Sequence, residues 1–188
     1  MEQNNMPIKF TATCLTLPQE QACASLGIDT SQKYAGSYGE ITPGCVTDFS
    51  VHCFNSATLE ILKNMGVNRA TLHPELNLAQ IRDIKKTIDT EIVIYGKLPL
   101  MIIGNPIDSG YITDRKGTAF FVQRDKLYNS VPIFMADKLN EIEKTGITHG
   151  RLIFTTETPD EVRQAIKAYM YRKPLKIEFT RGKFYSKV

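Results

Sequence analysis

The sequence predicts an α/β fold with a mainly parallel sheet and flanking helices, either a partial TIM-like (β/α) barrel or an open sheet. Apolar, β-branched runs alternate along the chain with segments of helical periodicity, which is typical of parallel α/β sheets. Three helical segments end at a glycine followed by an apolar residue, at Gly27, Gly66 and Gly146. Glycine readily adopts the left-handed conformation that ends a helix. A complete barrel needs about 250 residues, so this chain of 188 residues has room for only part of one.

The clearest unit spans residues 68–102. Its first predicted strand is Ala70–His73, which ends at His73 because Pro74 disfavours helix at the residue before it. Asn77 can cap the next helix, and apolar residues at helical spacing mark the buried face of that helix: Leu78, Ile81, Ile84 and Ile88. Glu91–Tyr95 then reads as a strand buried on both faces. A helix between two parallel strands is a βαβ unit.

The other expected elements lie on both sides of this unit. Before it we expect the strand Ile8–Cys14, the helix Pro18–Leu26, a long loop Thr30–Gly44, the strand Cys45–Phe54 and the helix Ser56–Met65. After it we expect a turn-rich connector Gly104–Gly110, a hairpin of Tyr111–Thr113 and Thr118–Val122, the strand Val131–Met135, the helix Asp137–Thr145, the strand Arg151–Thr155 and a helix from Thr158 to about Tyr171. We predict that Ala70–His73, Glu91–Tyr95 and Arg151–Thr155 are parallel strands of one sheet.

Composition limits the classes of protein. The net charge of +3 does not by itself indicate a nucleic-acid-binding protein. No apolar run is long enough to span a bilayer, and the N-terminal residues lack the pattern of a signal peptide. We therefore expect a cytoplasmic protein with no membrane partner. Its four cysteines, Cys14, Cys23, Cys45 and Cys53, form no CxxC pair. Small buried free thiols are the expectation, with a metal or iron–sulfur site as the sharper alternative.

Several sequence motifs resemble peptidase family U32, the collagenase-like proteases. HPELNLAQI followed by IVIYGKLPLMI resembles the core of the family, and TDFSVHCFNSATLEILKNMGV resembles the segment before it. TDRKGTAFFVQRD, LYNSVPIFMADKLNEI and EFTRGKFYSKV resemble the segments after it. The resemblance covers Val46–Val188. It implies a partial-barrel domain at residues 46–188, the C-terminal part of the family's barrel, preceded by a poorly matched strand, helix and loop at residues 1–45.

The resemblance implies a peptidase that hydrolyses a protein or peptide substrate. Relatives of this family are also described as factors that hydroxylate tRNA, rRNA or quinone precursors, so RNA modification is the alternative, and a catalytically silent fragment is a third. The hydroxylating relatives resemble one another in four cysteines placed after the strand equivalent to IVIYGKLPLMI. Here Asn105 stands where the first is expected, and no cysteine follows Cys53. We therefore expect no iron–sulfur cluster. A second copy, or the remainder of a longer barrel, could complete the domain.

Candidate site residues follow predicted strands. His73 and Glu75 come directly after the strand Ala70–His73, at the end where barrel active sites gather. They could serve in acid–base catalysis or bind a divalent metal, or they could simply build the turn. Glu75 is the catalytic candidate of the two, and His73 is a substrate-binding candidate. Arg181 in the closing segment could hold a carboxylate or phosphate, or form a structural ion pair. We expect Glu75 and Arg181 to share one rim of the sheet.

Further candidates lie in the second half of the chain. Asp114 is a third catalytic candidate, and Arg115 and Lys116 beside it are substrate-binding candidates, although a solvated hairpin turn explains all three. Asn129 is a substrate-binding candidate with turn chemistry as its alternative. Residues 169–188 are basic and interleaved with aromatic side chains, a composition that can bind RNA through phosphates and stacking but is more often a strand with one solvated face.

Overall fold

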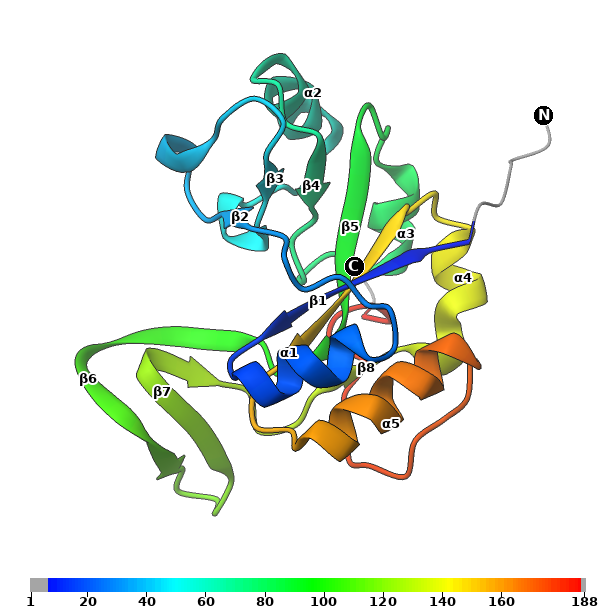
Figure 1. Ribbon diagram of the computed structural model, residues 1–188. Helices are drawn as coiled ribbons and strands as arrows, with labels where there is room; N and C mark the ends of the chain where they lie inside the picture. Colours follow the sequence, from blue (N-terminus) through cyan, green and yellow to red (C-terminus); the bar gives the residue numbers. More distant parts are fainter. Residues whose placement is uncertain (1–6, 187–188) are drawn as a thin grey trace.

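A parallel sheet forms the centre of the molecule. The computed structural model describes residues 7–186, without the side chains of residues 106 and 107 (Figure 1). The parallel strands, in spatial order, are β2 (Tyr34–Ala35), β3 (Val46–Thr47), β4 (Arg69–Thr71), β5 (Asp89–Gly96), β9 (His149–Phe154) and β1 (Lys9–Cys14). Strand β8 (Ile133–Phe134) pairs antiparallel with the end of β5. The predicted parallel arrangement of the strands around residues 70, 91 and 151 is confirmed.

The sheet curls until its two edge strands approach each other. The Tyr34 hydroxyl of β2 lies 3.3 Å from Thr11 Oγ1 of β1, at the opposite edge of the sheet. The backbone amide of Ala12 also donates a 2.9 Å hydrogen bond to the carbonyl of Asp29, on the segment that leads into β2. The curled sheet with its flanking helices is a partial TIM-like barrel, as predicted.

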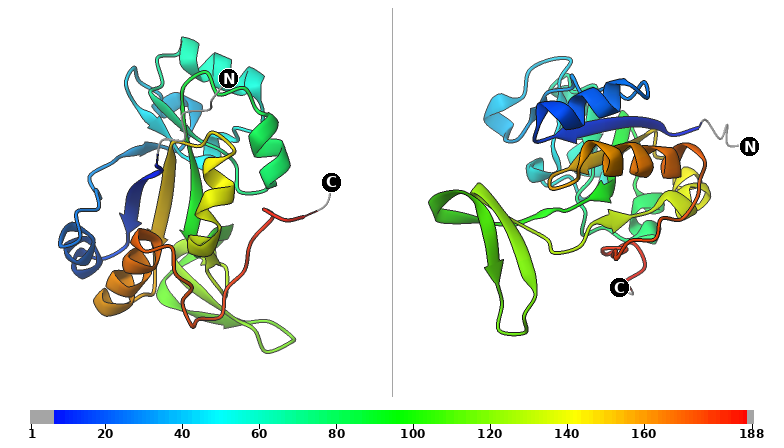
Figure 2. Two further views of the ribbon diagram at one scale, coloured as in Figure 1. Left: turned by 90° about the vertical axis from the view of Figure 1, so that its right-hand side faces the viewer. Right: turned by 60° about the horizontal axis from the view of Figure 1, so that its bottom comes forward.

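Within residues 7–186, five α-helices pack around the sheet (Figures 1 and 2). They are α1 (Leu17–Ala24), α2 (Ser56–Asn64), α3 (Leu78–Asp83), α4 (Leu139–Glu143) and α5 (Pro159–Met170). Helices α1 and α5 lie side by side. One continuous apolar cluster joins helices and strands, and includes Leu59, Leu62, Ile94, Ile142, Leu152, Phe154 and Ile166. Tyr169 of α5 fixes this packing, because its hydroxyl donates to the Ile94 carbonyl and accepts from the Met135 amide.

Local sequence signals account for the helix starts. Asn77 accepts a 2.9 Å hydrogen bond from the Gln80 amide, and the Gln80 side chain accepts from the Asn77 amide, so a capping box begins α3. Thr158 and Glu161 form the same arrangement at α5. Helix α3 is shorter than its apolar spacing predicts, because Ile84 already adopts extended backbone. Lys85 and Ile88 therefore lie outside it.

Three expected elements differ from the structure. The predicted strand Cys45–Phe54 is wrong beyond its start: β3 covers only Val46–Thr47, a 3-10 helix η2 (Phe49–Val51) follows, and His52 has left-handed backbone with φ 58°. Gly104–Gly110 is part of a strand rather than a connector. The loop Thr30–Gly44 contains β2 and the 3-10 helix η1 (Tyr38–Glu40).

The predicted helix Asp137–Thr145 is present in two parts. It begins with a 3-10 helix, η3 (Ala136–Lys138), and its α-helical part is α4.

A long antiparallel hairpin projects from the barrel, and we call it the arm (Figure 2). It consists of β6 (Pro99–Thr113) and β7 (Ala119–Tyr128), which form a separate two-stranded sheet. Gly96 lets the chain leave β5 toward the arm: its φ is +119°, and a Cβ there would collide with the carbonyl oxygen of Ile153. In residues 7–186, no helix has the length and apolarity that crossing a membrane requires.

Candidate functional site

Two adjoining cavities lie where the carboxyl ends of β2, β3, β4 and β5 meet. The first has a volume of about 530 Å³ and is lined by Tyr34, Gly36, Glu40, Asp48, Phe49, Ser50, residues 99–102 and Lys126. The second, of about 500 Å³, is lined by Phe49, His73, Pro74, Glu75, Leu98, Pro99, Leu100, Ile133, Gly182, Lys183 and Ser186. We call them together the rim cleft, because Phe49, Pro99 and Leu100 line both. The rim of a parallel barrel is where active sites form.

Loops that follow three strands position the walls of the rim cleft. After β3, the η2 turn and the left-handed backbone of His52 direct the chain back across the rim. The rings of His52 and His73 stack with centroids 5.2 Å apart, and the Phe54 ring lies 4.3 Å from His73. After β5, the start of the arm contributes Leu100 and Met101, which are 53% and 57% exposed. The rim cleft is therefore aromatic on one side and aliphatic on the other.

His73 has a defined hydrogen bond at the edge of the rim cleft. The backbone amide of Glu75 donates a 3.3 Å hydrogen bond to His73 Nδ1, so the neutral imidazole carries its proton on Nε2. Burial lowers the pKa of His73, against the opposing effect of the Glu75 carboxylate. A neutral imidazole with an available Nε2–H is a hydrogen-bond donor. Glu75 itself is exposed and lines the same cavity.

The closing segment lies at the rim, where Arg181 pairs with Asp137. The Phe184 carbonyl accepts from the Leu78 amide, and Gly182 and Lys183 line the rim cleft. Arg181 donates to both carboxylate oxygens of Asp137, at 2.6 and 2.8 Å, and lowers the pKa of that carboxyl. It is not among the residues that line the two cavities, so its catalytic role stays a prediction.

The remaining predicted residues lie on the arm or at its base. Asp114 Oδ1 accepts hydrogen bonds from the amides of Lys116 and Thr118, at 2.8 and 2.9 Å, which is turn chemistry at the tip of the arm. Arg115 beside them is exposed. Asn129 Oδ1 accepts from the Ser130 amide. None of these residues lines the rim cleft, and their functional roles stay predictions.

A charged network fills the inner face of the sheet beneath the rim cleft. Glu91 of β5 is fully buried, and its carboxylate accepts from Thr11 Oγ1 at 3.1 Å and Thr71 Oγ1 at 3.0 Å. The guanidinium Nε atoms of Arg69 and Arg151 lie 3.3 and 3.4 Å from it. One buried carboxylate thus faces two cations from the neighbouring strands β4 and β9. We call Glu91, Arg69 and Arg151 the inner triad.

The inner triad reaches the rim cleft through Asp48. Arg151 donates a 2.6 Å hydrogen bond to Asp48, which follows β3 and lines the first cavity. The guanidinium also lies 4.1 Å from the centroid of the Tyr34 ring, another cavity wall. Our sequence interpretation missed this network. A partial signal was present: Glu91 and Arg151 are charged residues that begin predicted strands whose other residues are mainly apolar, and charged residues almost never lie buried unless they are paired.

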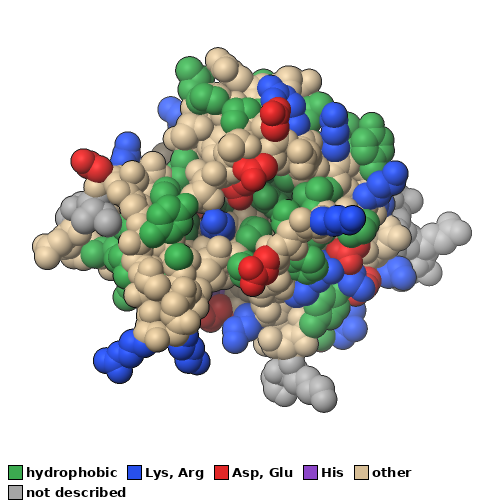
Figure 3. Space-filling model, turned by 90° about the horizontal axis from the view of Figure 1, so that it is seen from below, with side chains coloured by type: hydrophobic (Ala, Val, Ile, Leu, Met, Phe, Trp, Pro, Cys, Tyr) green, Lys and Arg blue, Asp and Glu red, His purple; other side chains and the backbone are tan. Residues whose placement is uncertain are grey.

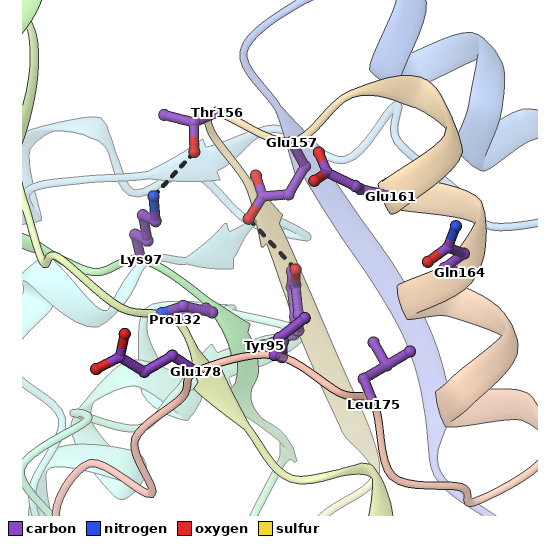
Figure 4. Close-up of a pocket in the computed structure, with 10 residues that line it drawn as sticks. Tyr95, Lys97, Pro132, Thr156, Glu157, Glu161, Gln164, Leu175 and Glu178 are labelled. Atoms are coloured by element: carbon purple, nitrogen blue, oxygen red, sulfur yellow. Dashed lines mark hydrogen bonds between the residues drawn. The ribbon is translucent and has the colours of Figure 1, made fainter.

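A third cavity, of about 210 Å³, lies on the same rim between β5 and β9 (Figure 4). The Tyr95 hydroxyl donates to Glu157 Oε1 at 3.3 Å, and Lys97 Nζ donates to Thr156 Oγ1 at 2.9 Å. Glu157 also accepts from the Thr155 amide. These groups already bind one another, so this cavity offers a ligand fewer free groups than the rim cleft does.

Metal and cluster ligands do not gather in the described part of the chain. Residues 7–186 contain no group of three or more His, Cys, Asp or Glu side chains that could hold a metal ion. Cys53 is buried, and burial raises the pKa of its thiol to about 12. Cys14 and Cys23 lie together at β1 and α1. The four cysteines therefore do not fit the ligand set of an iron–sulfur cluster, and a divalent metal stays a prediction.

One comparison with known proteins gives a match. The family model described as peptidase family U32 matches residues 45–120. The matched segment runs from β3 through β6 and contains most walls of the rim cleft, including Phe49, His73 and Leu100. The match does not extend over residues 121–188, so the resemblance of that part stays a prediction. No curated protein and no solved structure matches the chain.

Proposed function

We propose that this chain, whose residues 45–120 match the model of peptidase family U32, is a collagenase-like peptidase domain that binds an extended peptide in the rim cleft and hydrolyses it. The observation that carries the proposal is the rim cleft itself. It is a pair of adjoining cavities at the carboxyl ends of four parallel strands, with an aromatic wall, an aliphatic wall and a few polar groups. Binding sites of α/β sheets form at this edge.

An extended peptide fits the rim cleft because a strand forms one of its walls. Residues 99–102, the start of β6, line the first cavity. Within residues 7–186, β6 pairs only with β7. The other edge of β6 can therefore hydrogen-bond an added strand, while the exposed apolar side chains of Leu100 and Met101 offer contacts to side chains of the peptide.

Glu75 and His73 supply the chemistry in this proposal. The exposed Glu75 carboxylate takes a proton from a water molecule as the water oxygen attacks the peptide carbonyl carbon. The His73 Nε2–H donates to the oxyanion that forms, and the Lys183 ammonium offers a positive charge on the opposite wall. Glu75 then returns the proton to the leaving nitrogen, the C–N bond breaks, and a carboxylic acid and an amine are released.

The test uses gelatin-derived peptides with a fluorophore and a quencher at their ends. The parent chain is expected to cleave one of them. Glu75→Gln is expected to lose cleavage at unchanged thermal stability, because Glu75 is exposed. Asp83→Asn, an exposed carboxylate outside the cleft, is the matched control and is expected to cleave normally. Normal cleavage by Glu75→Gln would contradict the assignment.

The peptidase proposal as a whole is tested by binding and by chelation. Absence of both cleavage and peptide binding across the gelatin peptides would contradict it. If a chelator abolishes cleavage and a divalent cation restores it, the reaction depends on a metal ion. That result would contradict the mechanism in which Glu75 alone activates the water molecule.

RNA binding through residues 169–188 is the alternative proposal. The contacts of the tail weaken it: Arg172 is paired with Glu143, Arg181 with Asp137, and the aromatic rings of Tyr169 and Phe184 are buried. Lys187 lies outside the described residues. Seen from below, Lys and Arg side chains are interspersed with acidic and apolar ones (Figure 3). A salt-dependent affinity for single-stranded RNA, lost in Lys173→Gln and Lys176→Gln, would favour this alternative.

A further inference from the structure

Two thiols meet at the carboxyl end of β1, next to a cavity that shares Lys126 with the rim cleft. Cys14 is the last residue of β1, and Cys23 lies in α1. Their Sγ atoms are 3.6 Å apart and share a hydrogen bond. Cys14 is half-buried, whereas Cys23 is fully buried. A solvent reagent can therefore reach the pair only through Cys14.

A cavity opens at Cys14, between β1 and the arm. Its volume is about 320 Å³, and its walls are Cys14, Leu15, Gln123, Arg124, Asp125, Lys126 and Tyr128. Two of these side chains, Arg124 and Lys126, are cationic, and one, Asp125, is anionic. Arg124 has left-handed backbone with φ 56°, an uncommon conformation for a residue other than glycine. The cavity is large enough for a small ligand. Arg124 and Lys126 favour an anionic one, whereas the carboxylates of Glu20 and Glu157 lie close enough to the Cys14 thiol to raise its pKa.

We propose that Cys14 and Cys23 form a dithiol–disulfide site that exchanges with an anionic low-molecular-weight disulfide, of the glutathione disulfide class, held in this cavity. The site is independent of the peptidase proposal. It needs only the thiol pair, the access at Cys14 and the cations beside it.

The exchange proceeds in two balanced steps. The Cys14 thiolate attacks one sulfur of the small disulfide, its S–S bond breaks, and one half leaves as a thiolate that takes up the proton Cys14 lost. The Cys23 thiolate then attacks Cys14 Sγ in the mixed disulfide, and the second half leaves in the same way. The protein dithiol is oxidised by two electrons, and the small disulfide is reduced to two thiols.

The hydrogen bond between the sulfurs decides which thiol ionises first. It lowers the pKa of Cys23, while the same bond, burial and the carboxylates of Glu20 and Glu157 raise that of Cys14, so the pair loses its first proton from Cys23. Cys14 therefore attacks only after its own proton has moved to Cys23 across the shared hydrogen bond. Closing the disulfide must shorten the separation from 3.6 Å to about 2.05 Å. The end of β1 and α1 must therefore move together, beside the arm residues that line the same cavity.

The test treats the full chain with glutathione disulfide in a glutathione buffer, then maps disulfides by mass spectrometry after alkylation. The expected product is a Cys14–Cys23 disulfide. Cys23→Ser is expected to stop at a mixed disulfide on Cys14, and Cys14→Ser to react at neither position. Cys45→Ser and Cys53→Ser are the matched controls and are expected to form the disulfide normally. A chain that forms only mixed disulfides, or none, would overturn the proposal.

The charge preference is tested separately. The rate with glutathione disulfide is expected to fall about threefold in Arg124→Gln, whereas the rate with the neutral 2-hydroxyethyl disulfide stays unchanged. Equal rate losses with both reagents would overturn the assignment of the cavity to an anionic ligand. Circular dichroism of each variant shows whether it has folded. Because peptide cleavage is not the readout, failure of the peptidase proposal leaves this result interpretable.

Discussion

The two faces of the curled sheet are stabilised in different ways. Adjacent residues of β9 show the contrast: Leu152 packs into the apolar cluster between sheet and helices, while Arg151 points inward to Glu91 and Asp48. The outer face is stabilised by removing apolar surface from water. The inner face contains charges whose burial is tolerable only while every charge keeps its partners. The outer face thus stabilises the fold, and the inner face supports the floor of the rim cleft.

The largest expected effect comes from breaking the inner triad. Glu91→Ala leaves the partly buried Arg69 without its carboxylate and the buried Arg151 with Asp48 alone, and should lower the free energy of unfolding by about 3–5 kcal/mol. Urea denaturation measures it. Glu60→Gln is the control, because Glu60 forms an exposed helix pair with Lys63 and should change stability by less than about 0.5 kcal/mol. A Glu91→Ala chain as stable as the control would contradict the electrostatic account of the inner face.

Replacing the whole inner triad sharpens the comparison. Methionine at positions 69, 91 and 151 together removes all three charges, and should be more stable than Glu91→Ala alone, because the one partner left unpaired, Asp48, is partly exposed. Peptide binding in the rim cleft should weaken, since Asp48 loses Arg151. A triple variant less stable than the single one would show that shape, not charge balance, governs this face.

Truncation on the outer face should cost slightly less. Leu152→Ala leaves a cavity in the apolar cluster and should lower the free energy of unfolding by about 2–4 kcal/mol. Unlike Glu91→Ala, it should leave the charges beneath the rim cleft in place. The affinity of the folded variant for the peptide, measured without denaturant, should therefore stay unchanged. Urea denaturation and peptide titration together distinguish the two faces. Equal losses of peptide affinity in Leu152→Ala and Glu91→Ala would contradict the separate roles of the outer and inner faces.

The Arg181–Asp137 pair should have a smaller, pH-dependent effect. The hydrogen bond from Arg181 lowers the pKa of Asp137 in the folded chain. The resulting stabilisation is present above the unfolded pKa of about 3.9 and disappears as pH falls through the lower folded value. Arg181→Gln should cost about 0.2–1 kcal/mol at neutral pH, since both side chains are partly exposed, and the part of this loss that comes from Asp137 should disappear once pH falls below its folded pKa. The hydrogen bond from Arg181 to the Phe134 carbonyl does not depend on that carboxyl, so a smaller difference remains in acid. A difference that does not shrink as pH falls would contradict an ionic origin.

The smallest effect concerns the protonation of His73. Burial lowers its pKa below the ordinary value of 6.5. As pH falls from that value through the folded pKa, only the unfolded chain gains the proton, so stability declines over this window. An NMR titration of the ring should place its midpoint below 6.5, and Phe54→Ala, which removes a ring packed on His73, should raise it. A midpoint at or above 6.5 in the parent chain would contradict this description.

Periodicity and turn chemistry predicted most of the fold. The βαβ unit at residues 68–102, the helix starts at Asn77 and Thr158, and the parallel strands follow from local signals that agree with the tertiary structure. The strand Cys45–Phe54 failed because alternating apolar residues also suit a tight turn when tertiary contacts fix its backbone, as at His52. The arm was underestimated because its long antiparallel ladder overrides the turn-forming residues between Gly104 and Gly110.

The candidate site could be predicted only in part. His73 and Glu75 were found because proline marks the end of their strand, and the structure places both on the wall of the rim cleft. The partnership of Arg181 with Asp137 joins residues 44 positions apart, so no local pattern indicates it. The inner triad depends on the order of strands β4, β5 and β9 in the sheet, which only the fold supplies.

Hydrogen–deuterium exchange with and without a bound gelatin-derived peptide tests the central claim, that the rim cleft is the binding site, most directly. The uncleaving Glu75→Gln chain keeps the peptide intact during the measurement. The account predicts slower exchange at residues 99–102, where the peptide adds to the edge of β6, and at residues 73–76. It predicts unchanged exchange at the tip of the arm, residues 114–118. Protection confined to the tip or to residues 172–186, with none at the rim, would contradict it.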